Sequence, residues 1–232
     1  MAAMVEHRRN LEREEHQAVT PVEADHAAVR EVIAEVRAEG RLQLSESEGK
    51  RILRAYGIAT PEEGIAKDLP SALALAERIG YPVAMKVESP DIAHKTDIGG
   101  VVLDIDGPEE LERSYQVMLS RVHEKLPRAR ITGVSIQRMV RGREVIVGMV
   151  RDDQFGPVVT FGLGGIFVEI LRDVAHGIAP LDRNDAERMV RSIKAYPMLT
   201  GARGKRPGDI PALVDVILRV SQMAMEFPEL EE

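Results

Sequence analysis

The sequence of 232 residues contains no cysteine and no tryptophan, and aromatic residues make up only 3% of it. Without cysteine the chain can form no disulfide, thiolate metal site or cysteine nucleophile, which is compatible with a reducing compartment. The scarcity of aromatic rings argues against a protein that stacks nucleic-acid bases. A net charge of −7 argues in the same direction, because general nucleic-acid binders neutralise phosphates with Lys and Arg. We therefore expect no nucleic-acid partner.

Long apolar runs are also absent from the sequence. No stretch approaches the roughly 18 residues of a membrane-spanning helix, and the N-terminal run MAAMVEHRRNLEREEHQ lacks the apolar segment of a signal peptide. We expect a cytoplasmic protein with no membrane partner. An apolar fraction of 44% and a charged fraction of 30% are typical of a soluble protein with one large domain or two small lobes.

Helical and strand patterns alternate after a polar tail. Apolar residues recur at helical spacing within VEADHAAVREVIAEVRAEGR, and the capping-box pair Ser45 and Glu48 predicts the start of a second helix. Further on, SALALAERIG is typical of a helix, PVAMKVE and GGVVLDI of strands, and ITGVSIQRMV with REVIVGMVRD of a β-hairpin. This order predicts an α+β (mixed α/β) protein built as two lobes.

Lys86 lies inside PVAMKVE, where strand alternation would bury or half-bury its side chain. Because a buried ammonium is costly without an anionic partner, this position indicates either a structural ion pair or a phosphate ligand. The loop SPDIAHKTDIGG follows, and its Gly99 and Gly100 free the backbone to offer N–H groups to an anion. His94 and Lys95 add donors, and a histidine can also accept a phosphoryl group. The residues alone leave phosphate chemistry and an ordinary hairpin with a polar tip both open.

A second glycine-rich element, FGLGGIFVEILRDV, follows an apolar run. Its Gly164 and Gly165 would let the backbone approach a phosphate or another loop closely. Glu169 and Asp173 come next, and carboxylates at such a place could hold Mg2+, which prefers oxygen ligands and bridges nucleotide phosphates. Solvated charges on a connecting segment are the alternative.

Taken together, these motifs resemble a known family. The run SESEGKRILRAYGI, continuing to AERIGYPVAMKVESPDIAHKTDIGGV, resembles the nucleotide-binding (β) subunit or domain of ADP-forming acyl-CoA synthetases, the NDP-forming acetate–CoA ligases of the ATP-grasp superfamily. The resemblance extends through GREVIVGMVRDDQFGPVV and IKAYPMLTGARGKRP, and covers about residues 42–230. It implies an ATP-grasp fold whose two lobes, about 42–130 and about 131–232, clamp a nucleotide. For the residues before these lobes, the residue pattern itself predicts a flexible tail at 1–22 and a helix at 23–41.

The resemblance also implies an activity. It is that of an acid–thiol ligase, which converts acyl-CoA, ADP and phosphate into carboxylate, ATP and CoA with Mg2+. A CoA-binding α subunit is the expected partner, in an α2β2 heterotetramer. A phosphohistidine on that partner is implied to supply the phosphoryl group, and His94 to take part in passing it to ADP. A non-catalytic nucleotide sensor or scaffold with the same fold is the alternative.

Individual residues acquire expected roles from the same resemblance. The phosphate-side, nucleotide and metal candidates are Lys86, Lys95, Gly99 and Gly100; Gln137, Met139 and Val140 near the adenine; Glu144 near ribose or metal; Gly164 and Gly165; and Glu169 and Asp173 for Mg2+. Members of the family continue into a strand resembling xDINP, whose acid and asparagine serve the metal. The sequence reaches Glu232 before such a strand, so we expect either that the strand is supplied elsewhere or that metal binding is impaired.

Overall fold

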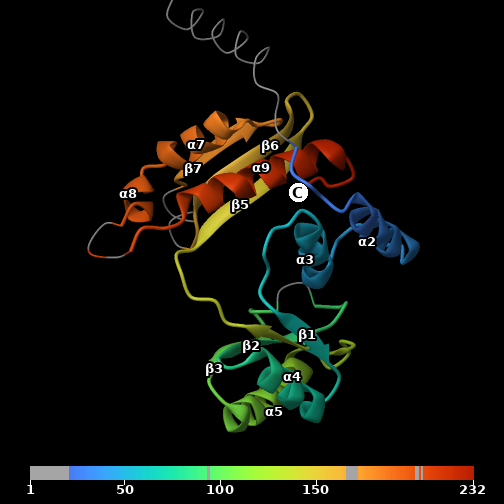
Figure 1. Cartoon of the computed structure of the whole chain (residues 1–232). Helices are drawn as coiled ribbons and strands as arrows, with labels where there is room; N and C mark the ends of the chain where they lie inside the picture. The colour runs from blue at the N-terminus through green and yellow to red at the C-terminus, as the bar shows by residue number, and fades with distance from the viewer. Residues whose placement is uncertain (1–20, 93–94, 166–171, 202–203, 205) are drawn as a thin grey trace, which may run out of the picture. The chain divides into compact units, whose positions relative to one another are not determined.

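A computed structural model describes residues 21–92, 95–165, 172–201, 204 and 206–232. It divides into two compact units: one comprises the chain up to Ala59 together with Gly142–Glu232, and the other comprises Thr60–Arg141 (Figure 1). The chain thus leaves the first unit at residues 59–60 and returns to it at 141–142. The expected tail at 1–22 lies almost wholly outside the described residues.

The two units have different bounds from the expected lobes, which began at residue 42 and changed at about 130. Helix α2 (His26–Ala38) and helix α3 (Glu46–Ala55) belong with the C-terminal half of the chain. The reason is their packing, because Val29 and Tyr56 are buried in the same core as Ile217 of helix α9 (Ile210–Glu226). Burial of apolar surface groups segments by contact and not by sequence position.

The unit at residues 60–141 is a sheet covered by helices. Its strands lie in the order β1 (Glu63–Ala66), β4 (Gly133–Arg138), β2 (Val83–Glu88) and β3 (Val101–Ile105), each antiparallel to its neighbours. Helices α4 (Leu69–Ile79) and α5 (Pro108–Lys125) lie on one side of this sheet (Figure 1). Val83, Met85 and Val87 point into the core beneath the helices. Because side chains alternate along a strand, Lys86 and Glu88 lie on the opposite face.

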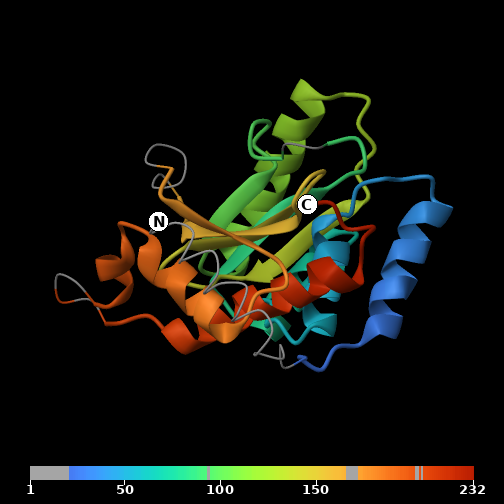
Figure 2. The ribbon, with the colours of Figure 1, turned by 90° about the horizontal axis from the view of Figure 1, so that it is seen from above.

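The other unit contains a three-stranded antiparallel sheet of β5 (Val145–Asp152), β6 (Gly156–Leu163) and β7 (Val174–Ile178). Helix α7 (Arg183–Ser192) and α9 pack on it, and Figure 2 shows them along one side of the strands. A short helix, α8 (Tyr196–Leu199), lies between these two helices in the chain. Buried Phe161 and Val159 of β6 join the core formed with α9.

The prediction that ITGVSIQRMV and REVIVGMVRD pair as a β-hairpin is wrong. These runs form β4 and β5, which belong to different sheets. Strand β4 has β1 on one side and β2 on the other, so neither of its edges is open to β5. Both runs form strands as their patterns predict, but β4 pairs with two strands far before it in the sequence, and β5 pairs with β6, the strand that follows it.

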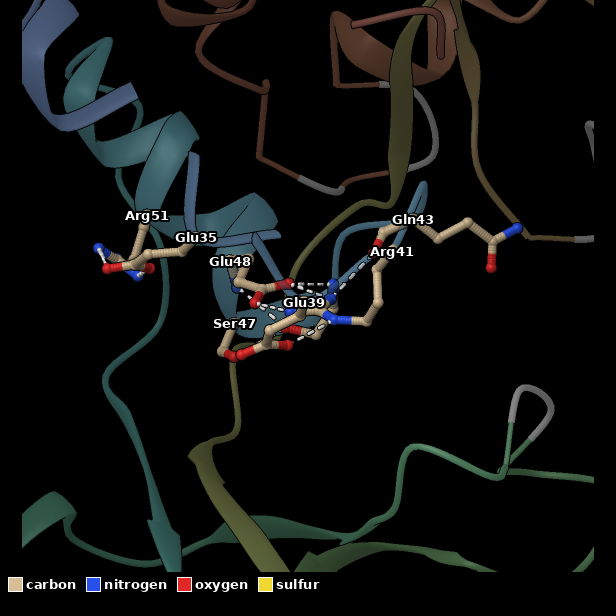
Figure 3. Close-up of polar contacts among 8 residues, drawn as sticks. Glu35, Glu39, Arg41, Gln43, Ser47, Glu48 and Arg51 are labelled. Carbon is tan, nitrogen blue, oxygen red and sulfur yellow. Dashed lines mark hydrogen bonds and ion pairs between the residues drawn. The ribbon is translucent and has the colours of Figure 1, made fainter. Parts of the chain in front are cut away.

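Arg41 connects the end of α2 to the start of α3 (Figure 3). Its guanidinium donates to the Glu48 carboxylate at 2.6 and 3.0 Å and to Glu39 at 2.7 Å. Glu48 also accepts the N–H of Ser45 at 2.6 Å, and the expected capping box at this helix start is confirmed. The hydrogen bond from Arg41 is the main reason that the pKa of Glu48 falls from 4.5 to about 2, against the opposing effect of partial burial.

Candidate functional site

Lys86 projects from the polar face of the four-stranded sheet, the face opposite α4 and α5. The register of β2 and β4 sets Lys86 opposite Ser135 and Ala84 opposite Gln137, so Lys86 and Gln137 are diagonal neighbours. The Lys86 ammonium is half-buried and donates to the Gln137 side-chain oxygen at 3.1 Å. The structure therefore brings together two residues that the sequence predicted for nucleotide binding.

Lys95 forms an ion pair that the sequence analysis did not predict. Its Nζ lies 2.8 Å from Oε1 of Glu88, and the side chains are only 20% and 21% exposed. Glu88 is the last residue of β2, two positions after Lys86 and on the same face. His94, the expected phosphoryl carrier, lies outside the described residues.

Gly99 and Gly100 close the turn that follows Lys95. The Gly100 N–H donates to the Lys95 carbonyl at 2.8 Å, and the Gly99 N–H donates to the Thr96 carbonyl at 3.0 Å. A Cβ atom on Gly100 would lie 2.6 Å from Cγ1 of Val87, so this position accepts no side chain without movement. The two N–H groups complete the turn itself, which differs from the anion-binding role expected of them.

The segment after β4 carries the residues expected near adenine. The Met139 N–H donates to the carbonyl of Pro82 at 3.1 Å, while the Val140 side chain is 68% exposed. Gln137, on β4, accepts the hydrogen bond from Lys86 described above. Contact of Gln137, Met139 and Val140 with adenine stays a prediction.

Glu144 meets the second glycine-rich element inside the other unit. The Gly164 N–H donates to the Glu144 carbonyl at 2.8 Å, and a Cβ on Gly164 would come within 2.8 Å of the Glu144 Cβ. Gly165 has a positive φ of +64°, and a Cβ built there lies 3.4 Å from a Glu144 carboxylate oxygen. Within the described residues no hydrogen-bond partner is found for that exposed carboxylate. Because Gly164 and Gly165 have no side chains, Glu144 can lie close against their backbone.

Asp173 has a structural role that differs from the expected one. Its carboxylate is buried and accepts the backbone N–H groups of Lys194 at 2.8 Å and Ala195 at 2.7 Å. Both oxygens are thereby used just before α8, which does not suit a metal ligand. Glu169 lies outside the described residues, among which no group of three His, Asp or Glu side chains forms a metal-ion site.

A nucleotide-bound Mg2+ nevertheless needs few protein ligands, because substrate phosphates and water supply most of its oxygens. One or two carboxylates are enough for such an ion. In the part of the chain that the structure describes, Glu144 is the predicted residue whose exposed carboxylate fits this requirement. The chemistry of the Glu144 carboxylate therefore suits a nucleotide-bound Mg2+ better than that of Asp173, and the metal role of Glu144 stays a prediction.

Arg143 is a further residue that the sequence analysis missed. Its guanidinium donates to the carbonyls of Leu199, at 3.4 Å, and Arg206. It borders a hollow of about 550 Å3 that Pro207 and Leu213 also line. The sequence around Arg143 does not indicate these contacts, because the carbonyl groups to which it donates are more than fifty positions away.

Comparison with known proteins agrees with this architecture. The sequence profile of the ATP-grasp domain matches residues 35–232, and the chain belongs to that family. Over 207 residues it is 49% identical to acetate–CoA ligase (ADP-forming) I subunit beta of Pyrococcus furiosus, covering 89% of each chain. It is 50% identical over 187 residues to acetate–CoA ligase (ADP-forming) I of Archaeoglobus fulgidus, but spans only 27% of that longer protein.

A solved structure extends the similarity to three dimensions. The dinucleotide forming acetyl-coenzyme A synthetase 1 of Ca. Korarchaeum cryptofilum, in complex with coenzyme A and Ca-AMPCP, superposes with a TM-score of 0.83 and 39% identity. The match covers 87% of this chain and 89% of that one. The expected family, the mixed α/β ATP-grasp fold and the relationship to ADP-forming ligases that bind nucleotide are confirmed. No helix in the described ranges is long and apolar enough to cross a membrane.

Proposed function

We propose that this chain is the nucleotide-binding β subunit of an ADP-forming acetate–CoA or acyl–CoA ligase. The observation that carries the proposal is the similarity to a named β subunit along 89% of both chains. The half-buried Lys86 on a polar sheet face supports it, because an ammonium held in a strand suits the phosphates of a nucleotide.

In the proposed reaction, acyl-CoA, ADP and phosphate become carboxylate, ATP and CoA. The step assigned to this chain moves a phosphoryl group from a histidine nitrogen to a terminal oxygen of ADP, so one N–P bond breaks and one O–P bond forms. Such transfer depends on in-line alignment of the attacking and leaving atoms and on neutralising the negative charge of the equatorial phosphate oxygens. Neutralising that charge is the role proposed for Lys86. His94 is the proposed carrier, and Mg2+ supplies further neutralisation of the phosphates when it is bound.

The proposed partner is a CoA-binding α subunit in an α2β2 heterotetramer. The name "subunit beta" of the Pyrococcus furiosus relative supports a partner. The Archaeoglobus fulgidus relative supports it too, because the matched region fills 27% of its length and the rest offers room for the partner's function. In this scheme acyl chemistry takes place on the α subunit and nucleotide chemistry on this chain.

Calorimetric titration of ADP into the chain, with Mg2+ present, tests nucleotide binding. We expect Lys86→Met to weaken ADP binding by at least about tenfold, as for removal of a charged partner of a phosphate. Lys67→Met is the matched control, since Lys67 is exposed in the same unit. Equal affinities for both variants would refute the role of Lys86.

The catalytic role needs the complex with the CoA-binding subunit. We expect ATP formation from acyl-CoA, ADP and phosphate, and its loss in His94→Ala while ADP binding is kept. ADP binding without turnover in the complete complex would instead support a nucleotide sensor or scaffold. Full activity of His94→Ala would remove that residue from the pathway and leave the fold assignment intact.

A further inference from the structure

We infer that Glu88 is a positioning residue that holds Lys95 and so places the start of the 95–100 turn. This inference rests on the proposed function, because the residue directly before Lys95 in the chain is His94. Lys95 had been expected to bind phosphate. The ion pair with Glu88 gives it a different role, as an anchor for the 95–100 turn.

The first part of the argument is that Glu88 is itself held firmly. Its carbonyl accepts both the N–H of Thr132 at 2.8 Å and the Thr132 hydroxyl at 3.1 Å. It also pairs with Gly133 across the β2–β4 ladder. Its carboxylate therefore projects from a backbone that Thr132 and strand β4 fix, and provides a stationary attachment point.

The second part is that Lys95 is held at both ends. Its ammonium lies 2.8 Å from the Glu88 carboxylate, and its carbonyl accepts the Gly100 N–H at 2.8 Å. The Gly100 carbonyl in turn accepts the N–H of Val87, next to Glu88 on β2, at 2.8 Å. The backbone hydrogen bonds hold the end of the turn against β2, and the ion pair holds its beginning there.

The third part concerns charge. A lysine that binds phosphate works through its positive charge, but here a carboxylate in direct contact cancels it. Both side chains are about four-fifths covered, so water screens their attraction less than at an open surface. A phosphate would have to displace Glu88 from Lys95 and leave a partly buried carboxylate without its partner, which is unfavourable.

Position matters for the proposed chemistry because phosphoryl transfer requires in-line placement, and a misplacement of about 1 Å can lower a rate about a hundredfold. Releasing Lys95 should therefore lower the rate of the chemical step more than it lowers nucleotide affinity. This separates an anchor from a phosphate ligand, whose loss would first weaken ADP binding.

The test compares Glu88→Gln, Lys95→Met and the double variant in the complex with the CoA-binding subunit. We expect each single variant to lower kcat by about tenfold or more with unchanged KM and Kd for ADP, and the double variant to be no worse than either. The charge-swapped pair Glu88→Lys with Lys95→Glu should recover much of the lost kcat. Glu112→Gln and Lys67→Met, exposed in the same unit, are the matched controls.

Amide hydrogen exchange gives a readout that does not depend on activity. We expect faster exchange of the Gly100 and Val87 N–H groups in Glu88→Gln, with the remainder of β2 unchanged. Tighter ADP binding in Glu88→Gln together with weaker binding in Lys95→Met would show that Lys95 is a phosphate ligand and overturn the inference. Unchanged kcat and unchanged exchange would overturn it as well. An inactive wild-type complex would count against the proposed function instead, and hydrogen exchange would then still decide whether the anchor exists.

Discussion

The ion pair between Arg41 and Glu48 makes a quantitative prediction. Glu48→Gln removes the charge but keeps an amide oxygen and a side chain that capping boxes accept at this position. The change therefore isolates the charge on a carboxylate that Arg41 contacts at 2.6 and 3.0 Å (Figure 3).

The expected loss follows from the pKa of Glu48, which falls from 4.5 to about 2, mainly through its hydrogen bond with Arg41. At 1.36 kcal/mol per pH unit this fall in the pKa corresponds to at most about 3.4 kcal/mol. Solvent screening of a pair this near the surface reduces the expected loss to about 1–2 kcal/mol. For a chain of this length that lowers the Tm by about 3–6 °C.

The dependence on pH has a definite sign. Because the folded pKa lies below the unfolded one, the stabilisation is fully present above about pH 4.5 and disappears as the pH falls towards about 2. Urea unfolding, followed by circular dichroism, should therefore show a difference between wild type and Glu48→Gln that shrinks across this range.

Glu46→Gln is the matched control for this experiment. Glu46 lies in the same first turn of α3 and pairs with Lys50 at 2.8 Å, but its side chain is 43% exposed, against 15% for Glu48. We expect this variant to lose no more than about 0.5 kcal/mol, the usual range for ion pairs four residues apart on a helix. Equal losses for the two variants, or a Glu48→Gln loss that does not change with pH, would refute the reasoning.

Two further substitutions test the geometry of the candidate site. Gly100→Ala should destabilise the protein by about 1–3 kcal/mol in urea unfolding, because its Cβ would lie 2.6 Å from Val87 Cγ1 and 3.0 Å from the Lys95 carbonyl; Gly107→Ala, with open space at its Cβ, is the control, and equal effects would contradict the clash. Asp173→Asn should lower stability by about 1–2 kcal/mol, since one of two backbone N–H groups loses its acceptor. The same variant should keep the Mg2+ dependence of ADP binding, and loss of that dependence would restore Asp173 as a metal ligand.

Local features were predictable from the sequence because their causes lie within a few residues. The capping box of Ser45 and Glu48 depends only on positions three apart, and it forms as expected. Alternation in PVAMKVE predicted a buried or half-buried side chain at Lys86, and the side chain is half-buried, since the repeat of two is a property of the extended backbone. The resemblance of a long, ordered set of motifs then predicted the ATP-grasp fold, which the family match confirms.

Pairing over long distances was not predictable in the same way. Nothing in ITGVSIQRMV shows that β4 would pair with β1 and β2 and not with β5, because strand patterns specify which face is apolar and not which strand lies beside it. The same holds for Asp173, a plausible metal ligand by composition whose two oxygens are taken by backbone N–H groups of Lys194 and Ala195.

The sequence by itself thus determined the elements, the half-buried position of Lys86 and the family, because these depend on local periodicity and on ordered motifs. Only the tertiary structure decided that Glu144 approaches Gly164 and that Glu88 neutralises Lys95. Both contacts depend on side chains and backbone that folding brings within a few ångströms. At such distances a lysine that suits phosphate chemistry in sequence becomes the anchor of a turn.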